Sequence, residues 1–159
     1  MKAMSFLVDS ELYVVDATLM HKVVRSISIT SVPTSNNAVV GIINLKGKVI
    51  TILSIPELFG VSKNSEITPE LYSNVAIFKP VRGDNDQMGV LIDTPGSLID
   101  IDEDLMLPPP IDKEQQNSAF ISGVVNADNK LYRILDITAI FESFTVSGAK
   151  HTVEANKED

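Results

Sequence analysis

The sequence predicts an all-β fold with short helices, arranged as two small five-stranded barrels side by side. Most apolar runs in the 159-residue chain are short, rich in Val and Ile, and separated by turn residues, which is typical of strands. Two parts of the chain also resemble each other, which indicates that one unit is present twice, and each unit holds about five strands. Five strands are too few to cover both faces of an open sheet, whereas a small barrel buries its inner face and leaves few edges.

The expected strands follow one another along nearly the whole chain. The turns between them include Lys46-Gly47, residues 83–86 (Gly-Asp-Asn-Asp) and Asp128-Asn129, which are residue types that tolerate the positive φ of tight hairpins. The expected strands are 6–8, 12–15, 29–32, 39–45, 49–53, 75–78, 88–92, 97–101, 120–125 and 131–135.

Three segments are expected to be helical. Residues 56–59 form a single turn, with Pro56 near its start and Gly60 as its stop, and residues 137–144 are its counterpart near the end of the chain. The remaining segment is expected from apolar residues that recur at helical spacing behind the candidate N-cap Asp16, namely Leu19, Met20, Val23, Val24 and Ile27.

An internal repeat indicates how these elements are organised. Residues 41–59 align with residues 123–141 without a gap, and upstream residues 13–16 resemble residues 90–93. The alternative is chance matching among β-branched residues, which the matching Gly, Asn, Lys and Phe disfavour. The sequence thus predicts one domain over residues 1–148, made of two duplicated barrel subdomains, and a polar tail over residues 149–159. The identical pairs are Gly41/Gly123, Asn44/Asn126, Lys48/Lys130, Ile52/Ile134, Leu53/Leu135, Ile55/Ile137 and Phe59/Phe141.

Composition excludes several classes of function. The formal net charge of −8 disfavours binding to nucleic acid and to anionic lipid surfaces. The chain has no cysteine, which excludes disulfides, thiolate catalysis and thiolate metal sites. It has neither a membrane-spanning run of about 20 apolar residues nor a signal peptide, so we expect it in the cytoplasm.

A search for catalytic and ligand-binding motifs predicts no catalytic residue, cofactor or metal site. The only histidines are His21 and His151, and no G-x-S-x-G elbow is present. The Gly-rich segment that ends at Lys48 has the wrong spacing for a phosphate-binding loop. The acidic run 100–104 lacks the Gly and the final Glu of a calcium loop, so it is expected to be a solvated acidic loop.

Residues 41–53, which read GIINLKGKVITIL, resemble the signature hairpin of CheW-like domains. That hairpin normally reads G-h-h-N-L-R-G-x-h-h-P-h-h-D-L, where h is apolar. The chain departs from it at three positions, where Lys46, Thr51 and Ser54 replace Arg, Pro and Asp. Similar segments follow in the family's order, including the strand at 89–93, a proline-containing connector at 108–110 and a closing hairpin at 121–136.

The resemblance implies two intertwined SH3-like barrels and a non-catalytic scaffold or adaptor for signal transduction. CheW-like proteins couple the cytoplasmic tips of chemoreceptors (methyl-accepting chemotaxis proteins) to the regulatory domain of the histidine kinase CheA in bacterial chemotaxis. Three alternatives stay open: the same fold in a non-flagellar chemosensory pathway, a CheW-like domain from a larger fused protein, and a small-molecule-binding β module. Met1, just before the first strand, and the polar tail favour a complete chain over a fragment, and a ligand-binding module requires a sizeable pocket.

The resemblance also implies two sets of contact residues. Candidates for the receptor-binding groove are Met20 and Leu98, with Lys22 and Lys46 at its edge. The alternative reading is structural: Met20 and Leu98 lie in the interior, Gly41 relieves a strand bend and Leu45 belongs to the core. Candidates for the kinase contact are Val40, Gly41, Asn44 and Leu45.

Overall fold

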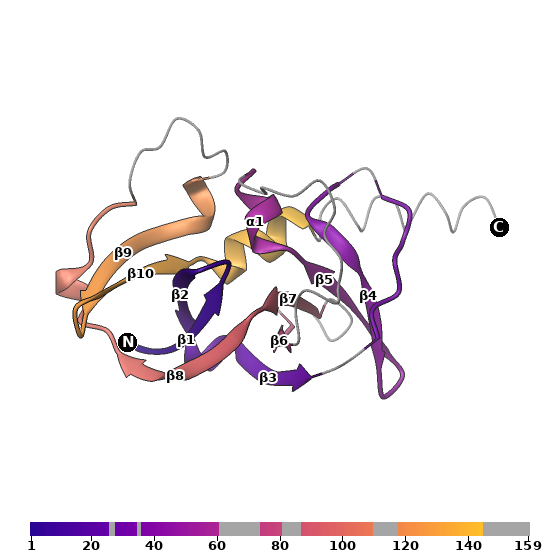
Figure 1. The fold of residues 1–159 in the computed structure, drawn as a ribbon, viewed down its shortest axis with the longest axis horizontal. Helices are drawn as coiled ribbons and strands as arrows, with labels where there is room; N and C mark the ends of the chain where they lie inside the picture. Colours follow the sequence, from indigo (N-terminus) through magenta and orange to yellow (C-terminus); the bar gives the residue numbers. More distant parts are fainter. Residues whose placement is uncertain (26–27, 35, 61–73, 81–86, 110–117, 145–159) are drawn as a thin grey trace.

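The computed structural model of the chain describes residues 1–25, 28–34, 36–60, 74–80, 87–109 and 118–144 (Figure 1). The chain forms two five-stranded sheets with few short helices, which confirms the predicted all-β class. The strands are β1 (Lys2–Val8), β2 (Glu11–Asp16), β3 (Met20–Arg25), β4 (Val39–Leu45), β5 (Lys48–Leu53), β6 (Asn74–Phe78), β7 (Met88–Ile92), β8 (Thr94–Asp100), β9 (Ile121–Ala127) and β10 (Lys130–Leu135). The helical elements are η1 (Ala17–Leu19), α1 (Ile55–Leu58), η3 (Glu103–Leu105), η4 (Ser118–Phe120) and a helix at 137–144.

The two sheets are intertwined, because each takes strands from distant parts of the chain. The first barrel has the strand order β8-β1-β2-β10-β9, and the second has the order β3-β6-β7-β5-β4. Among the described residues, one isolated bridge connects the two edges of each sheet: Leu107, beyond β8, pairs with Val124, and Thr30, beyond β3, pairs with Ile42. Neither barrel is therefore closed by a continuous ladder of hydrogen bonds within this part of the chain.

The two repeated hairpins have the same register. Asn44 lies opposite Val49 in the β4–β5 hairpin, and Asn126 lies opposite Leu131 at the matching place in the β9–β10 hairpin. Each hairpin also has one shift of register, next to Gly41 in β4 and next to the equivalent Gly123 in β9. Upstream of the hairpins, β2 pairs in parallel with β10, and β7 pairs in parallel with the equivalent strand β5. These two registers make Val90 equivalent to Val15, so the predicted match of residues 13–16 with residues 90–93 was wrong by two residues. The proposed domain end at residue 148 and the tail at 149–159 lie outside the described residues.

Two predicted turns adopt the expected left-handed backbone. Lys46 and Gly47 have φ values of 53° and 84°, and Asp128 and Asn129 have values of 52° and 62°. A third such turn, Asp9-Ser10, joins β1 to β2 and was not expected from the sequence. The predicted turn at 83–86 lies outside the described residues.

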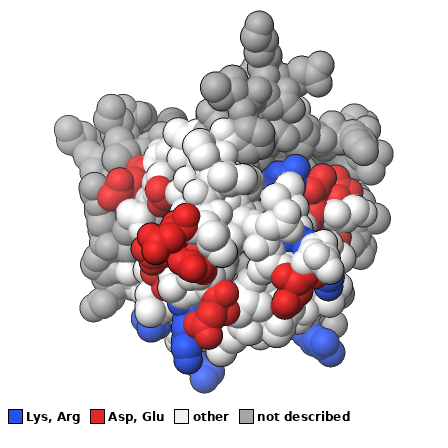
Figure 2. Space-filling view, turned by 90° about the vertical axis from the view of Figure 1, so that its left-hand side faces the viewer, with Lys and Arg blue, Asp and Glu red and all other residues white. Residues whose placement is uncertain are grey.

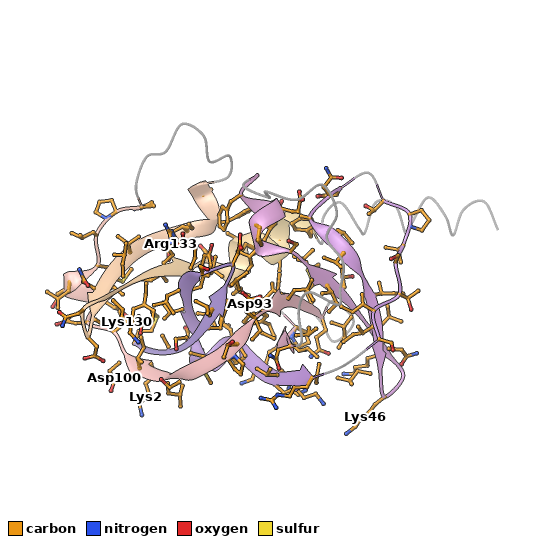
Figure 3. The ribbon with its side chains drawn as sticks, viewed as in Figure 1. Lys2, Lys46, Asp93, Asp100, Lys130 and Arg133 are labelled. Atoms are coloured by element: carbon orange, nitrogen blue, oxygen red, sulfur yellow. The ribbon has the colours of Figure 1, made fainter. Side chains whose placement is uncertain are left out.

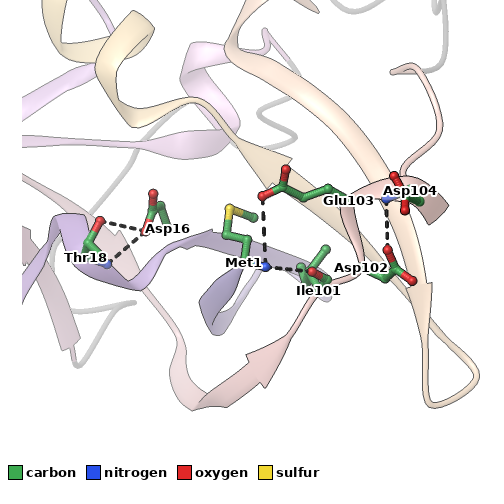
Figure 4. Close-up of polar contacts among 7 residues, drawn as sticks. All are labelled: Met1, Asp16, Thr18, Ile101, Asp102, Glu103 and Asp104. Carbon is green, nitrogen blue, oxygen red and sulfur yellow. Dashed lines mark hydrogen bonds and ion pairs between the residues drawn. The ribbon is translucent and has the colours of Figure 1, made fainter.

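The predicted helix behind Asp16 is wrong. Asp16 does cap a turn, because its carboxylate accepts a hydrogen bond from the Thr18 amide, but that turn is the short η1 and the chain continues as strand β3 (Figure 4). A bulge in β3 after Met20 shifts the alternation of its side chains, so Met20 and Val23 both face the same core. This spacing of three imitates a helical period.

The remaining predictions of secondary structure differ in outcome. The helical turn before Gly60 and the helix at 137–144 are confirmed. The predicted strand at 29–32 is wrong, because only Thr30 pairs, at the bridge to Ile42. The register of β4 shifts between Val39 and Gly41, and this shift interrupts the edge of β4 along which the predicted strand at 29–32 would have paired.

Three apolar clusters hold the fold together. The largest, the joint core, lies between the two barrels, where α1 and the helix at 137–144 are also found (Figure 1). The interior of the first barrel is built around Val14, Tyr132 and Ile134 and that of the second around Ile43, Ile50 and Ile77. Because the joint core takes residues from both barrels, we expect them to unfold together. Its largest members include Phe6, Tyr13, Phe59, Phe78 and Phe141.

The acidic run after β8 has local structural roles. The Asp102 carboxylate accepts a hydrogen bond from the Asp104 amide and caps η3 (Figure 4). The Met1 ammonium donates to the Ile101 carbonyl at 2.9 Å and lies 4.0 Å from a Glu103 oxygen. Within the described part of the chain, no three histidine, aspartate or glutamate side chains come together as metal ligands would.

Candidate functional site

The two apolar residues predicted for the receptor groove have different surroundings. Leu98, on β8, is 59% exposed, although it is a large apolar side chain. Met20, at the start of β3, is partly buried and packs against the joint core. Leu98 is therefore available to a partner, whereas Met20 also contributes to stability.

The two lysines predicted for the groove edge come together at one end of the second barrel. Lys22, from β3, and Lys46, from the β4–β5 turn, line an open pocket of about 340 Å³. Neither Met20 nor Leu98 lines this pocket. Figure 3 shows Lys46 at the tip of its hairpin, at the end of the molecule opposite Asp100 and Lys130. The complete lining is His21, Lys22, Leu45, Lys46, Lys48, Ile50, Pro80 and Gln87, which we call the basic pocket.

Two of the four residues predicted for the kinase contact have clear structural roles. A Cβ atom added at Gly41 would lie 2.3 Å from the Thr30 carbonyl oxygen, so glycine is needed for the bridge between Thr30 and Ile42. The Asn44 carboxamide oxygen accepts a hydrogen bond of 3.0 Å from the Gly47 amide and supports the turn. Val40 and Leu45 pack partly against the interior of the second barrel.

Sequence reasoning missed an exposed apolar residue beside these four. Val49 lies opposite Asn44 in the hairpin and is 55% exposed. Its equivalent in the other hairpin, Leu131, is 49% exposed. The available signal was an apolar residue at an outward-facing position of a strand whose inward positions, Ile50 and Ile52, are buried.

The opposite end of the molecule carries acidic side chains. Figure 2 faces this end, with the first barrel toward the viewer, and shows several groups of aspartate and glutamate on it. The exposed acids of β8 and η3, which are Asp100, Asp102, Glu103 and Asp104, belong to the first barrel's side of the structure. Lysine and arginine side chains also lie on this face, so it carries charges of both signs.

An ion pair joins β2 and β10 on the surface of the first barrel, where these two strands pair in parallel. The Arg133 guanidinium binds the Glu11 carboxylate at this parallel junction. Tyr13 lies in the same register as Arg133, and its ring stacks on Phe6 with centroids 6.1 Å apart. Burial raises the pKa of the Tyr13 hydroxyl to about 12, and the nearby Arg133 charge opposes this effect only in part.

One departure from the family pattern preserves its structural role. Ser54 replaces the family's Asp after the second strand of the hairpin, and its hydroxyl accepts a hydrogen bond of 3.4 Å from the Glu57 amide at the start of α1. At the equivalent place, Asp136 accepts from the Ala139 amide at 2.9 Å. Serine and aspartate are both good N-caps, so the replacement retains the cap.

Comparisons with known proteins identify the family. The model of the CheW-like domain matches residues 2–145. A chemotaxis protein CheW from Thermotoga maritima is 30% identical over 146 residues, covering 91% of this chain and 90% of that protein. Another from Treponema pallidum is 23% identical over 139 residues, covering 87% and 81%.

A solved structure agrees with these matches. The crystal structure of the scaffolding protein TtCheW from Thermoanaerobacter tengcongensis aligns with a TM-score of 0.70 and 30% identity, over 86% of this chain and 84% of that one. No helix in the described ranges is long and apolar enough to cross a membrane. The sequence match over nearly the whole chain and the shared architecture lead to one conclusion: the chain belongs to the CheW-like domain family.

Proposed function

We propose that this chain is a non-catalytic cytoplasmic adaptor that couples chemoreceptors to the histidine kinase CheA. The observation that carries the proposal is the CheW-like match over residues 2–145, together with relatives named as chemotaxis proteins CheW. Leu98 is 59% exposed, so its side chain is accessible to a receptor, as the proposed contact requires. Receptor contact through Met20, Lys22 and Lys46 belongs to the same proposal.

A reconstitution experiment tests the coupling. Membrane vesicles that contain a receptor, purified CheA from the same genome and this protein are combined, and kinase autophosphorylation is measured with each component left out in turn. We expect full activity only when all three are present, because an adaptor brings receptor and kinase together without reacting itself. Equal activity with and without this protein would refute the proposal.

Two leucines allow the receptor contact to be separated from general surface effects. Leu98→Asp should abolish co-sedimentation with receptor vesicles and leave the circular dichroism spectrum unchanged, because the side chain is exposed. Leu105→Asp is the matched control, since Leu105 is 63% exposed in η3 and is not part of the proposed contact. Equal binding by both variants would remove Leu98 from the receptor site.

The kinase contact is better tested at Val49 than at Gly41. Gly41 is needed for the barrel, so a bulky residue there would damage the fold as well as any interface. Val49→Asp places a charge beside Asn44 and Leu45 on an exposed position, and should weaken binding to the CheA regulatory domain by at least tenfold. Leu131→Asp makes the same change on the equivalent hairpin. If both variants lose binding equally, the β4–β5 hairpin is not the specific contact.

A further inference from the structure

The outer edge of β8 carries backbone groups that no described strand pairs with. β8 is an end strand of its sheet, and among the described strands it pairs only with β1. On the β1 side, the Ile101 amide donates to the Met1 carbonyl at 2.8 Å, and the Ser97 amide donates to a serine hydroxyl of β1 at 3.0 Å. Successive residues of a strand direct their N–H and C=O groups to opposite sides, so Leu98 and Asp100 direct theirs to the outer edge. A further strand can therefore pair with β8 at these two residues.

The equivalent edge of the second barrel, on β3, is built differently. The strand registers make Leu98 equivalent to Val23, and Asp100 equivalent to Arg25. Val23 packs against the joint core, whereas Leu98 is 59% exposed. Lysine on an edge strand discourages pairing with another chain, and β3 carries Lys22, whereas β8 has no lysine. The fold therefore requires neither an exposed leucine nor an acid at the edge of β8.

The features that protect β8 from pairing are confined to its first half. Pro95 has no N–H group, and the register shift between Met4 and Phe6 of β1 bends this part of the edge. From Leu98 to Asp100 the strand holds no proline, and its pairing with β1 is regular. The accessible part of the edge is thus the second half of β8.

We propose that this edge binds an extended, basic segment of a partner protein as an additional antiparallel strand. Leu98 and Asp100 lie on the same face of β8, because side chains two residues apart in a strand point to the same side. The segment places an apolar residue beside Leu98 and, two residues away, a lysine or arginine beside Asp100. Both are favourable cross-strand pairs, and they add specificity to the backbone hydrogen bonds of strand addition.

Charge favours a basic segment over a second copy of this chain. Asp100 is exposed and lies opposite Lys2 of β1, but no ion pair joins the two among the described residues. Its carboxylate can therefore pair with a cation from a partner. Two copies that each have a net charge of −8 repel each other, whereas a basic segment is attracted.

This inference goes beyond the proposed adaptor role and concerns a different kind of partner. No residue of β8 lines the basic pocket, and a strand bound at this edge covers Leu98. Because Leu98 also belongs to the proposed receptor contact, the two partners exclude each other at this residue. The edge of β8 is then a place where a second protein can regulate receptor coupling.

The test is an NMR titration of the full chain with the heptapeptide Thr-Lys-Thr-Val-Thr-Lys-Thr, blocked at both ends. Its valine matches Leu98, and its lysines lie on the same face, so that one of them reaches Asp100. We expect saturable shifts of the Leu98 and Asp100 amides, and none at the equivalent Val23 and Arg25 of β3. N-methylation of the valine removes the N–H group that points to Leu98 in an antiparallel pair and should abolish saturation.

A pair of variants tests the charge contact. Asp100→Asn should weaken peptide binding by about two- to fivefold, as expected for one exposed ion pair. Asp128→Asn, the matched control, removes an exposed acid from the β9–β10 turn and should leave binding unchanged. Both changes lie at exposed positions, so the circular dichroism spectrum should stay the same.

Three results would overturn the inference: no saturable shifts, equal binding of the N-methylated peptide, or equal effects of the two variants. Dimerisation of the free chain in sedimentation, if Leu98→Asp abolishes it, would also overturn the inference by identifying a second copy as the occupant. The outcome is separable from the proposed function. The peptide titration contains neither receptor nor kinase, so its failure leaves the adaptor role intact, and failed reconstitution leaves saturable peptide binding intact.

Discussion

The two hairpins β4–β5 and β9–β10 share a scaffold and differ in their surfaces. Their registers match, and the bond from the Ser54 amide to the Ala38 carbonyl recurs from Asp136 to Phe120, each at 2.8 Å. We propose that they come from one duplicated unit. The turn, however, carries Lys46 in one hairpin and Asp128 in the other. Buried positions have thus kept the fold, while exposed positions have been free to acquire separate contacts.

Substitutions of equivalent residues in the joint core should produce the largest losses of unfolding free energy. Phe59 and Phe141 are equivalent and almost fully buried, so replacing either with Ala should cost about 3–5 kcal/mol of unfolding free energy. Phe141 also meets Phe78 edge to face, with centroids 5.5 Å apart, and such a pair contributes a further ~0.5–1.5 kcal/mol. Phe141→Ala should therefore be the more destabilising change in urea unfolding. Equal losses would show that the two hairpins are equivalent in energy as well as in register.

The second-largest expected effect is a loss of stability at alkaline pH, which should come from Tyr13 in the first barrel. The pKa of Tyr13 is about 12 in the folded state, above its ordinary value of 10.0. Below pH 10 the hydroxyl is protonated in both states, and between pH 10 and 12 only the unfolded state loses the proton. The unfolding free energy should thus fall by about 2–3 kcal/mol across that window. Met88 is the equivalent residue in the second barrel and does not ionise. Tyr13→Phe should remove this loss, and an unchanged pH profile would contradict the assignment.

The two bridging glycines provide a smaller contrast. A Cβ atom at Gly41 would lie 2.3 Å from the Thr30 carbonyl oxygen, and one at Gly123 would lie 2.7 Å from the Leu107 carbonyl oxygen. Gly→Ala should cost about 1–3 kcal/mol at each position, with the larger loss at Gly41 because its neighbour is closer. Thermal unfolding followed by circular dichroism measures the order. A neutral Gly41→Ala would mean that the bridge can move away without loss.

The helix caps give the smallest expected difference. Asp136→Ala and Ser54→Ala each remove an N-cap, at about 0.5–2 kcal/mol. Asp136 should be the costlier loss, since its bond to the Ala139 amide is 2.9 Å long and charge-assisted, against 3.4 Å for Ser54 and Glu57. Chemical unfolding of the two single variants tests this ranking. The reverse order would show that the buried Ser54 hydroxyl stabilises its helix more than the Asp136 carboxylate does.

Local patterns predicted most of this fold, and they failed where the alternation of side chains is broken. The strand over residues 39–45 was predicted with its observed bounds, because its apolar run ends at a clear turn, Lys46-Gly47. In β3 the bulge after Met20 gives apolar residues a spacing of three, which the sequence alone cannot distinguish from a helix. Which hairpin joins which barrel has no local signal, and only the family resemblance implied that the barrels are intertwined.

The candidate site was predicted in part. The sequence pattern could place Lys46 in a turn, but it could not show that His21 and Lys22 of β3 and Gln87 before β7 line the same pocket, because these segments lie far from Lys46 in the sequence. The pattern also could not separate exposed Leu98 from half-buried Met20, since both are apolar residues in strands. Exposure depends on the joint core, which forms only when the two barrels meet.

The exchange of strands between the barrels has a consequence for synthesis on the ribosome. The hairpin β1–β2 is translated first, but its partner strands β8 and β10 come from the last part of the chain. Roughly 100 residues separate Asp16 from β9, which at about 5–20 residues per second is a delay of roughly 5–20 s. All five strands of the second barrel are made within that time. We therefore expect the second barrel to form first, and Phe6 and Tyr13, which share the joint core with it, to pack against it before β9 and β10 are made.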